Sequence, residues 1–161
     1  MTTVDMATSQ TQVSRTLRTI TLIVLVLALF VTGYLAYTKA TNTQVACLEG
    51  ANISCDSVSS SIYANFPRGA NGIPVAYLGF LTWLVIGALV VLENRVGILR
   101  EYGVVFLLGI TVFGFLFHSY LTYTSIVFVG AICPWCIGAH VLMTILLIVQ
   151  GIRAYRQFAA R

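Results

Sequence analysis

Residues 17–37 read LRTITLIVLVLALFVTGYLAY, and this stretch decides the class of fold. Its apolar length matches the roughly 20 residues that a helix needs to cross the hydrocarbon core of a bilayer. Three more stretches of the same kind follow at residues 74–92, 102–123 and 130–150. Of the 161 residues, 58% are hydrophobic and only 9% are charged, against about a quarter charged in soluble domains. We therefore expect an all-α polytopic membrane protein built as a bundle of four transmembrane helices.

Little chain remains outside these spans. The longest stretch between them, residues 38–73, is shorter than the roughly 50 residues of a small soluble domain. We predict a cytoplasmic polar tail at residues 1–16, a membrane domain at 17–151 with an outer loop at 38–73, and a cytoplasmic basic tail at 152–161. The first dozen residues show no apolar period, so we expect them to be disordered.

The basic residues predict the orientation, because Lys and Arg near the ends of spans are retained on the cytoplasmic side. Seven of the nine fall on one side of the predicted bundle: Arg15, Arg18, Arg95, Arg100, Arg153, Arg156 and Arg161. Only Lys39 and Arg68 fall on the other side. This pattern predicts an inner-membrane protein with both termini cytoplasmic and with residues 38–73 and a short turn at 122–130 outside. It also explains the net charge of +4 without a nucleic-acid partner.

The predicted outer loop contains polar residues followed by an apolar patch at residues 62–66. Asp56 or Ser57 is expected to cap a short helix that runs to about residue 65. The apolar patch would give that helix one hydrophobic face. We therefore predict a short interfacial helix that lies flat over the bundle at the membrane surface.

The four cysteines carry the candidate chemistry: Cys47, Cys55, Cys133 and Cys136. The predicted topology places all of them at the outer face, which is the compartment where disulfides persist. Cys133-Pro-Trp-Cys136 is a C-x-x-C unit, an arrangement that lowers a thiol pKa and lets two sulfurs alternate between dithiol and disulfide. It opens the last span, where unpaired backbone N–H groups and the helix dipole favour a thiolate. Cys47 and Cys55 are eight positions apart, so they could close a disulfide or bring one sulfur to another site.

Cys136 lies one helical turn deeper than Cys133, nearer to any reactant dissolved in the bilayer. The chain has no metal or flavin motif, so a two-electron couple at the membrane edge needs an acceptor that lives in the membrane. A lipid quinone, either menaquinone or ubiquinone, fits that description. A four-cysteine zinc site is disfavoured because zinc pairs usually lie two to four residues apart. Purely structural disulfides are disfavoured because a C-x-x-C disulfide is constrained and labile.

Several spacings in the chain together resemble a known family. Asp56 follows Cys55 directly, Ser61 lies six positions after it, and Gly72-Ile73-Pro74 ends the outer loop. With the two cysteine pairs, these residues resemble the bacterial homologues of vitamin K epoxide reductase over about residues 17–150. The resemblance implies a four-helix bundle around a quinone site.

The resemblance also implies roles for the cysteines. Cys47 and Cys55 would form the shuttle pair, and Cys133 and Cys136 the quinone-proximal pair. Electrons would pass from a thioredoxin-like or DsbA-like thiol protein to Cys47, and then from Cys55 to Cys133, with Cys136 facing the quinone. Many bacterial members carry a fused thioredoxin-like domain. Here the chain ends eleven residues after Gln150, so we expect the partner to be a separate protein.

Two further residues are candidate quinone contacts besides Cys136. His140 stands four positions after the last cysteine, where animal members have a tyrosine that hydrogen-bonds the vitamin. A histidine there could donate to a quinone, or it could be satisfied by a neighbouring helix. Ser61 is the second candidate. His118, near the outer end of the third span, is expected at the membrane interface.

Two rival functions differ from this prediction in testable ways. An oxidase of the DsbB kind also has four helices and two cysteine pairs, but its C-x-x-C pair lies in the first outer loop rather than at the start of the last span. A non-catalytic membrane protein with structural disulfides, such as a channel subunit, should show polar pore-lining residues at helical spacing, which these spans lack. The sequence therefore predicts a quinone-dependent thiol oxidoreductase that re-oxidises an extracytoplasmic thiol protein.

Overall fold

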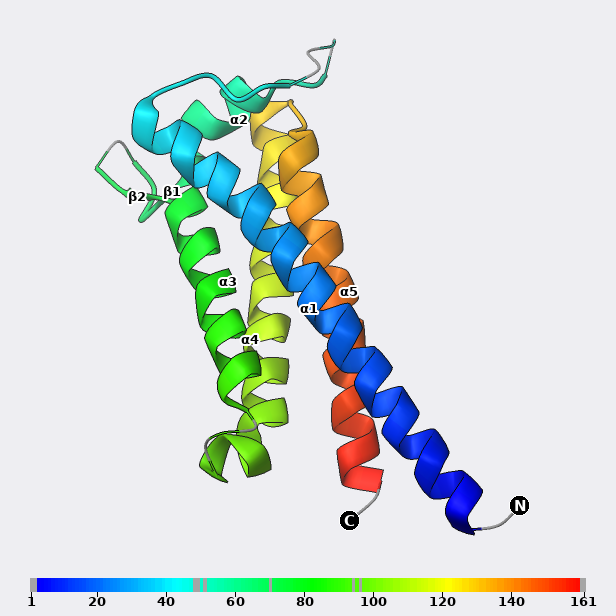
Figure 1. Cartoon of the computed structure of the whole chain (residues 1–161). Coiled ribbons are helices and arrows are strands. Elements are labelled where there is room, and N and C mark those ends of the chain that lie inside the picture. Colours follow the sequence, from blue (N-terminus) through cyan, green and yellow to red (C-terminus); the bar gives the residue numbers. More distant parts are fainter. Residues whose placement is uncertain are drawn as a thin grey trace.

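Four long helices make up most of the protein in the computed structural model, which describes residues 3–47, 50, 52–69, 71–93, 95 and 97–159. They are α1 (Thr3–Thr41), α3 (Val75–Leu92), α4 (Gly97–Thr124) and α5 (Pro134–Ala159) (Figure 1). Each contains a segment long and apolar enough to cross a membrane: Arg15–Thr41, Val75–Leu92, Tyr102–Val129 and Pro134–Ala159. The predicted all-α architecture of four spans is confirmed.

The helices close into a bundle because each packs against two others. α5 lies against α4 and α1, α1 also packs on α3, and α3 contacts α4. The core between them is apolar and consists of Val24, Leu25, Ala28, Trp83, Ile86, Val90, Leu107, Met143 and Leu146. Large apolar side chains such as Phe30 and Phe113 point outward instead. A helix that is hydrophobic on all sides is expected where the outer surface faces lipid.

The helix α1 begins earlier than expected. It starts at Thr3, so the prediction that the first dozen residues are disordered is wrong for those that the structure describes. Once a long span has nucleated a helix, each added residue gains a hydrogen bond, and propagation is cheap. The sequence contains no glycine or proline before Gly33 to stop the helix.

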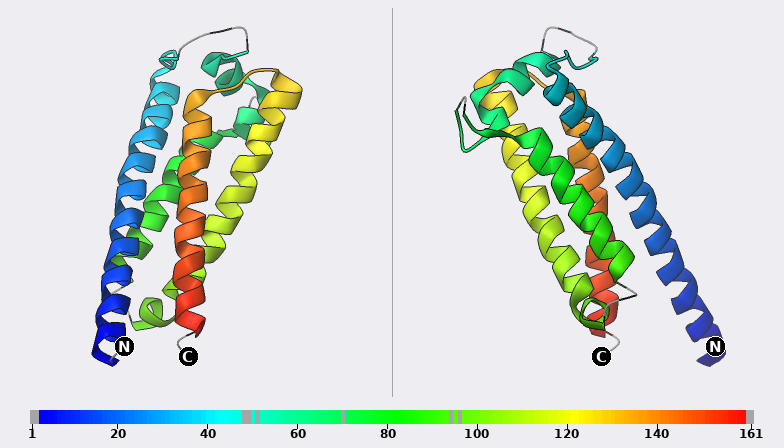
Figure 2. Two further views of the ribbon diagram at one scale, coloured as in Figure 1. Left: turned by 90° about the vertical axis from the view of Figure 1, so that its right-hand side faces the viewer. Right: turned by 60° about the vertical axis from the view of Figure 1, so that its left-hand side comes forward.

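The short elements gather at the end of the bundle opposite the two chain termini (Figure 2). They are α2 (Cys55–Ser60), the 3₁₀ turn η1 (Ile62–Ala64), and the antiparallel strands β1 (Asn65–Phe66) and β2 (Ile73–Pro74). The predicted loop helix is therefore present but shorter.

The cap of α2 differs from the prediction as well. Ser54, rather than Asp56 or Ser57, caps the helix, because the Ser54 hydroxyl accepts the N–H of Ser57 at 3.3 Å. The helix ends at Ser61, whose backbone is extended, with φ −64° and ψ 154°. The extended Ser61 divides the predicted helix into α2 and η1.

The connection between α4 and α5 is tighter than predicted. α4 continues directly into a π-helical segment, η2 (Ser125–Val129), so helical structure covers most of the predicted 122–130 turn. Gly130 then adopts a left-handed conformation with φ +70°, a geometry that glycine reaches without strain. Only residues 130–133 separate η2 from α5, which places the C-x-x-C segment at the same end of the bundle as α2.

Charged side chains join elements at both ends. Lys39 of α1 donates to the carbonyl of Ser59 in α2 at 2.9 Å. Arg68 donates to the Tyr120 hydroxyl, and its guanidinium lies 5.3 Å from the centre of the Tyr63 ring. At the opposite end, a salt bridge of 2.5 Å between Arg153 and Glu93 connects α5 to the end of α3.

Candidate active site

The loop cysteines form a disulfide in the structure. Cys47 and Cys55 are bonded, with their Cα atoms 6.1 Å apart. The sequence left open whether this pair closes on itself or reaches another site, and here it is closed. Cys55 is 1% exposed, whereas Cys47 is only partly buried. A soluble thiol therefore meets Cys47 before it meets Cys55.

The backbone brings the loop pair to the C-x-x-C pair. The N–H of Ile132 donates to the carbonyl of Asn52 at 2.9 Å, and the N–H of Ser54 donates to the carbonyl of Ile132 at 3.2 Å. These bonds make a parallel bridge between Ile53 and Ile132. Cys133 follows Ile132 directly, and Cys55 follows Ser54 directly. The two buried cysteines of different pairs therefore lie on the two segments that this backbone pairing joins.

Cys133 and Cys136 are free thiols at the start of α5. Cys133 is 4% exposed and immediately precedes the helix, and Cys136 lies within its first turn and is partly buried. The hydrogen bond with the Cys136 thiol is the largest of the interactions that lower the pKa of Cys133, to about 7. Burial opposes this effect, and the backbone N–H groups of Cys136 and Trp135 add to it. The expected thiolate stabilisation at the helix start is therefore present, together with a larger contribution from the second thiol.

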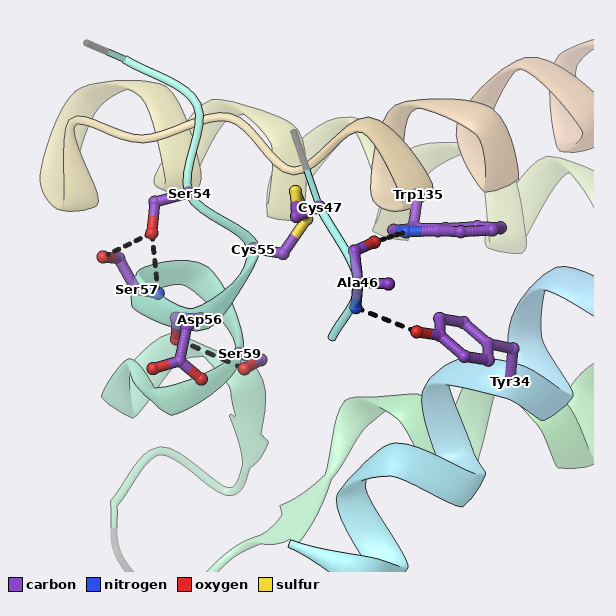
Figure 3. Close-up of a disulfide and its surroundings, with 9 residues drawn as sticks. All are labelled: Tyr34, Ala46, Cys47, Ser54, Cys55, Asp56, Ser57, Ser59 and Trp135. Atoms are coloured by element: carbon purple, nitrogen blue, oxygen red, sulfur yellow. Dashed lines mark hydrogen bonds between the residues drawn. A yellow bond between two sulfur atoms is a disulfide. The ribbon is translucent and has the colours of Figure 1, made fainter. Parts of the chain in front are cut away.

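Sequence reasoning missed one set of contacts at the site. The indole N–H of Trp135, inside the C-x-x-C unit, donates to the carbonyl of Ala46 at 2.8 Å (Figure 3). The N–H of Ala46 donates to the Tyr34 hydroxyl of α1 at 2.9 Å. The rings of Tyr34 and Trp135 pack with centroids 4.9 Å apart. Trp135 is partly buried and carries one indole N–H donor, so this side chain was the available signal.

His140 lies one turn below Cys136 on the same face of α5, since positions i and i+4 share a face. Its ring nitrogens face two hydroxyls of α4, Thr122 at 3.2 Å and Ser119 at 3.4 Å. The Ser119 hydroxyl already donates to the Phe115 carbonyl. Ser119 must therefore accept from His140 Nε2–H, and Thr122 shares a hydrogen bond with Nδ1. Both ring nitrogens are satisfied by the neighbouring helix, with the Ser119 contact the longer of the two.

His118 turns its ring toward α5. The ring lies 6.2 Å from that of His140, and its Nδ1 donates to the Gly114 carbonyl at 2.9 Å. Both histidines of the chain therefore meet between α4 and α5. That His118 lies at the membrane interface stays a prediction.

Ser61 lies at the end of α2, where its hydroxyl donates to the Val58 carbonyl at 2.8 Å. Its backbone N–H donates to the same carbonyl at 3.4 Å. A quinone carbonyl can only accept a hydrogen bond, and the one donor hydrogen of the Ser61 hydroxyl is already used. The geometry therefore gives Ser61 a part in ending α2.

Within the described residues, no three His, Cys, Asp or Glu side chains are grouped so that they could hold a metal ion. Two of the four sulfurs are bonded to each other, and the other two share a hydrogen bond. One pair is thus a disulfide and the other a pair of free thiols, and the segments that carry them are joined by the backbone pairing of residues 52–54 with Ile132. Such a site can pass two electrons at a time by thiol–disulfide exchange.

The chain matches the Vitamin K epoxide reductase family over residues 19–150. This match covers most of the chain, including all four helical spans and both cysteine pairs, and the protein belongs to that family. It is accordingly a multi-pass membrane oxidoreductase of a family whose members are, in general, quinone-coupled thiol oxidoreductases.

Proposed function

We propose that this protein re-oxidises a separate thioredoxin-like thiol protein outside the cytoplasm of a bacterial cell and passes the electrons to a membrane quinone, which supports disulfide bond formation. The pairing of residues 52–54 with Ile132 carries this proposal, because it joins the segment that leads into Cys55 to the segment that leads into Cys133. Two redox couples that meet at one junction, at the end of four membrane-crossing helices, fit transfer between a water-soluble donor and a lipid-soluble acceptor.

The first exchange takes place at Cys47. A thiolate of the partner attacks Cys47, the bond between Cys47 and Cys55 breaks, and Cys55 leaves as a thiolate. The second thiolate of the partner then resolves the mixed disulfide, so the partner becomes oxidised and the loop pair becomes a dithiol. The burial of Cys55 supports Cys47 as the sulfur that is attacked.

The second exchange passes the electrons inward. Cys55 attacks Cys133 of an oxidised C-x-x-C pair and releases Cys136 as a thiolate. Cys47 then attacks Cys55, which restores the loop disulfide and releases Cys133. A thiol with a low pKa leaves faster, so the lowered pKa of Cys133, about 7, favours this release. The product has a closed loop disulfide and a reduced C-x-x-C pair, which is the state of the structure.

A quinone would supply the final step by accepting two electrons and two protons from the reduced pair. Cys136 is the proposed contact because it is the deeper of the two thiols and is not fully buried. His140 is the second proposed contact, because it needs to give up only the longer bond, to Ser119, in order to donate elsewhere. For Ser61 we propose the structural part in α2, which holds Cys55 at the junction.

We also propose that both termini are cytoplasmic and that the cysteine pairs face outward. The termini lie together at one end of the bundle and α2 at the other (Figure 2). Most basic residues lie toward the end with the termini, and such residues are retained inside during insertion.

Trapping experiments test the proposed order. In proteoliposomes that contain menaquinone or ubiquinone, with a reduced thioredoxin-like protein as donor, alanine at any one of the four cysteines should abolish quinone reduction. Cys136→Ala should accumulate a disulfide between Cys55 and Cys133, which forms when Cys133 attacks Cys55 of the loop disulfide and Cys47 leaves, because Cys136 is no longer there to break that bond by attacking Cys133. Cys55→Ala should hold the partner on Cys47.

Non-reducing gels with peptide mapping distinguish these species, and Ser60→Ala, at an exposed position of α2, serves as the matched control with normal turnover. A link between Cys47 and Cys133 in the Cys136→Ala variant would reverse the roles proposed for the loop sulfurs. Normal turnover by Cys133→Ala would refute the proposed function.

A further inference from the structure

The backbone of Ala46, the residue that precedes Cys47, is held from two sides. Ala46 donates its N–H to Tyr34 of α1 and accepts the indole N–H of Trp135 from α5 (Figure 3). The two aromatic rings also pack on each other, with centroids 4.9 Å apart. Both backbone polar groups of this residue are therefore fixed by side chains from two different helices.

The other arm of the loop is held in a different way. Residues 52–54 pair with Ile132 through backbone atoms alone, so this attachment would form with almost any side chains there. The attachment of Ala46 depends on one hydroxyl and one indole N–H. Both parts of the loop, Ala46 and residues 52–54, are hydrogen-bonded to the short segment 132–135. Only at Ala46 do side chains make these bonds.

We propose that Tyr34 and Trp135 are positioning residues that keep Cys47 at Cys55 while the loop disulfide is open. This inference rests on the proposed function, because it concerns the mixed disulfide between Cys55 and Cys133. That intermediate has two fates. Attack of Cys47 on Cys55 completes the transfer, whereas attack of Cys136 on Cys133 reverses it.

Holding the backbone at Ala46 favours the attack of Cys47 on Cys55 because it raises the effective concentration of Cys47 near Cys55. A tethered group that is kept in place reacts as if it were far more concentrated than the same group on a free segment. In the forward step the bond between Cys55 and Cys133 breaks, the bond between Cys47 and Cys55 forms, and Cys133 leaves as a thiolate. One disulfide replaces another, so no outside oxidant or reductant is needed.

Cys136→Ala gives a direct test without any quinone or partner. That variant keeps three cysteines, and the two isomers that the proposal concerns are the one with the bond between Cys47 and Cys55 and the one with the bond between Cys55 and Cys133. Their ratio reports how well Cys47 is held at Cys55. Tyr34→Phe and Trp135→Phe, each placed in this background, remove one hydrogen-bonding group and keep an aromatic ring.

Each substitution should shift the ratio about 2- to 12-fold toward the bond between Cys55 and Cys133, the range that corresponds to one hydrogen bond. The isomers are equilibrated at neutral pH, quenched with acid, alkylated at the remaining thiol and quantified by peptide mapping. Tyr37→Phe is the matched control. Tyr37 lies three positions further along α1 and is 65% exposed, so its substitution should leave the ratio unchanged.

The outcomes separate the two proposals. If Cys136→Ala alone forms no bond between Cys55 and Cys133, the proposed transfer between the pairs is wrong, and the positioning role is wrong with it. If that bond forms but neither aromatic substitution changes the isomer ratio, the transfer stands and the positioning role is refuted. A shift toward the bond between Cys47 and Cys55 would refute it as well.

Discussion

Cys133 owes its low pKa mainly to a neighbouring thiol rather than to the helix alone. The hydrogen bond with Cys136 is the largest contribution, and the backbone N–H groups at the start of α5 are smaller ones. The two sulfurs of the C-x-x-C pair therefore have unequal roles in the reduced state. Cys133 carries the charge, and Cys136 provides the hydrogen bond that stabilises it.

This asymmetry predicts how Cys133 titrates when its neighbour is changed. In a background with alanine at both loop cysteines, the thiolate absorbance should rise around pH 7 when Cys136 is present. Cys136→Ala removes the donor, so the thiolate is less stabilised and the midpoint should move to higher pH. Cys136→Ser keeps a donor and should keep a midpoint closer to 7. Equal midpoints in the alanine and serine variants would contradict the assignment.

The sequence predicted the four reactive sulfurs from their types and spacing, but not the contacts that organise them. The C-x-x-C spacing and its place at the start of a span were enough to expect a thiolate near Cys133. Trp135 could only be assigned a partner once the fold had brought Ala46 beside it, since 89 positions separate them. His140 illustrates the same limit, because the hydroxyls that satisfy it belong to another helix.

At the level of elements, the hairpin of β1 and β2 sets where α3 begins. Its two strands are paired through Asn65 with Pro74 and Phe66 with Ile73. Gly72 sits inside this turn with no room for a side chain. A Cβ atom there would lie 2.1 Å from the carbonyl oxygen of Pro67 and 2.9 Å from Cβ of Asn65.

Gly72→Ala should therefore open the hairpin, because backbone atoms cannot move aside as the end of a flexible side chain can. We expect faster proteolytic cleavage between residues 65 and 73 and a lower melting temperature in detergent. Gly79→Ala is the control, since a Cβ atom at Gly79 in α3 would meet nothing within 4 Å. Equal cleavage of the two variants would show that the hairpin tolerates a side chain at position 72.

The elements were predicted best where periodicity and length alone decide them. The four spans were identified because about 20 apolar residues leave few alternatives. The cap of α2 was mistaken because Ser54, Asp56 and Ser57 are all good caps by residue type. Ser54 takes the role because residues 52–54 are fixed by pairing with Ile132, a long-range contact that no local rule contains.

At the level of the whole molecule, the two basic residues that break the charge bias have identifiable structural roles. Lys39 bonds to the last turn of α2, and Arg68 bonds to Tyr120 and lies over Tyr63. Both contacts hold the outer elements against the bundle. These contacts explain why Lys39 and Arg68 lie at the end of the bundle with few basic residues. The two exceptions to the charge bias therefore do not weaken the proposed orientation.

Labelling can test that orientation in intact cells. In a background with all four cysteines changed to serine, Thr43→Cys should react with a membrane-impermeant maleimide added outside. Phe158→Cys, near the end of α5, should react only after the membrane is permeabilised. Both positions are exposed in the structure, so access depends on the side of the membrane. The opposite labelling pattern would overturn the proposed orientation.

The burial of Cys55 and Cys133 has a consequence for bystander molecules in the compartment. Thiol exchange needs a direct approach of the attacking thiolate to a sulfur, so small thiols and oxidants in solution cannot reach these two sulfurs. In the proposed transfer, side reactions at Cys55 and Cys133 are therefore limited by access rather than by reduction potential. The proposed donor would be selected at the surface around Cys47. A related protein could then change its partner by altering that surface while the buried cysteines stay unchanged.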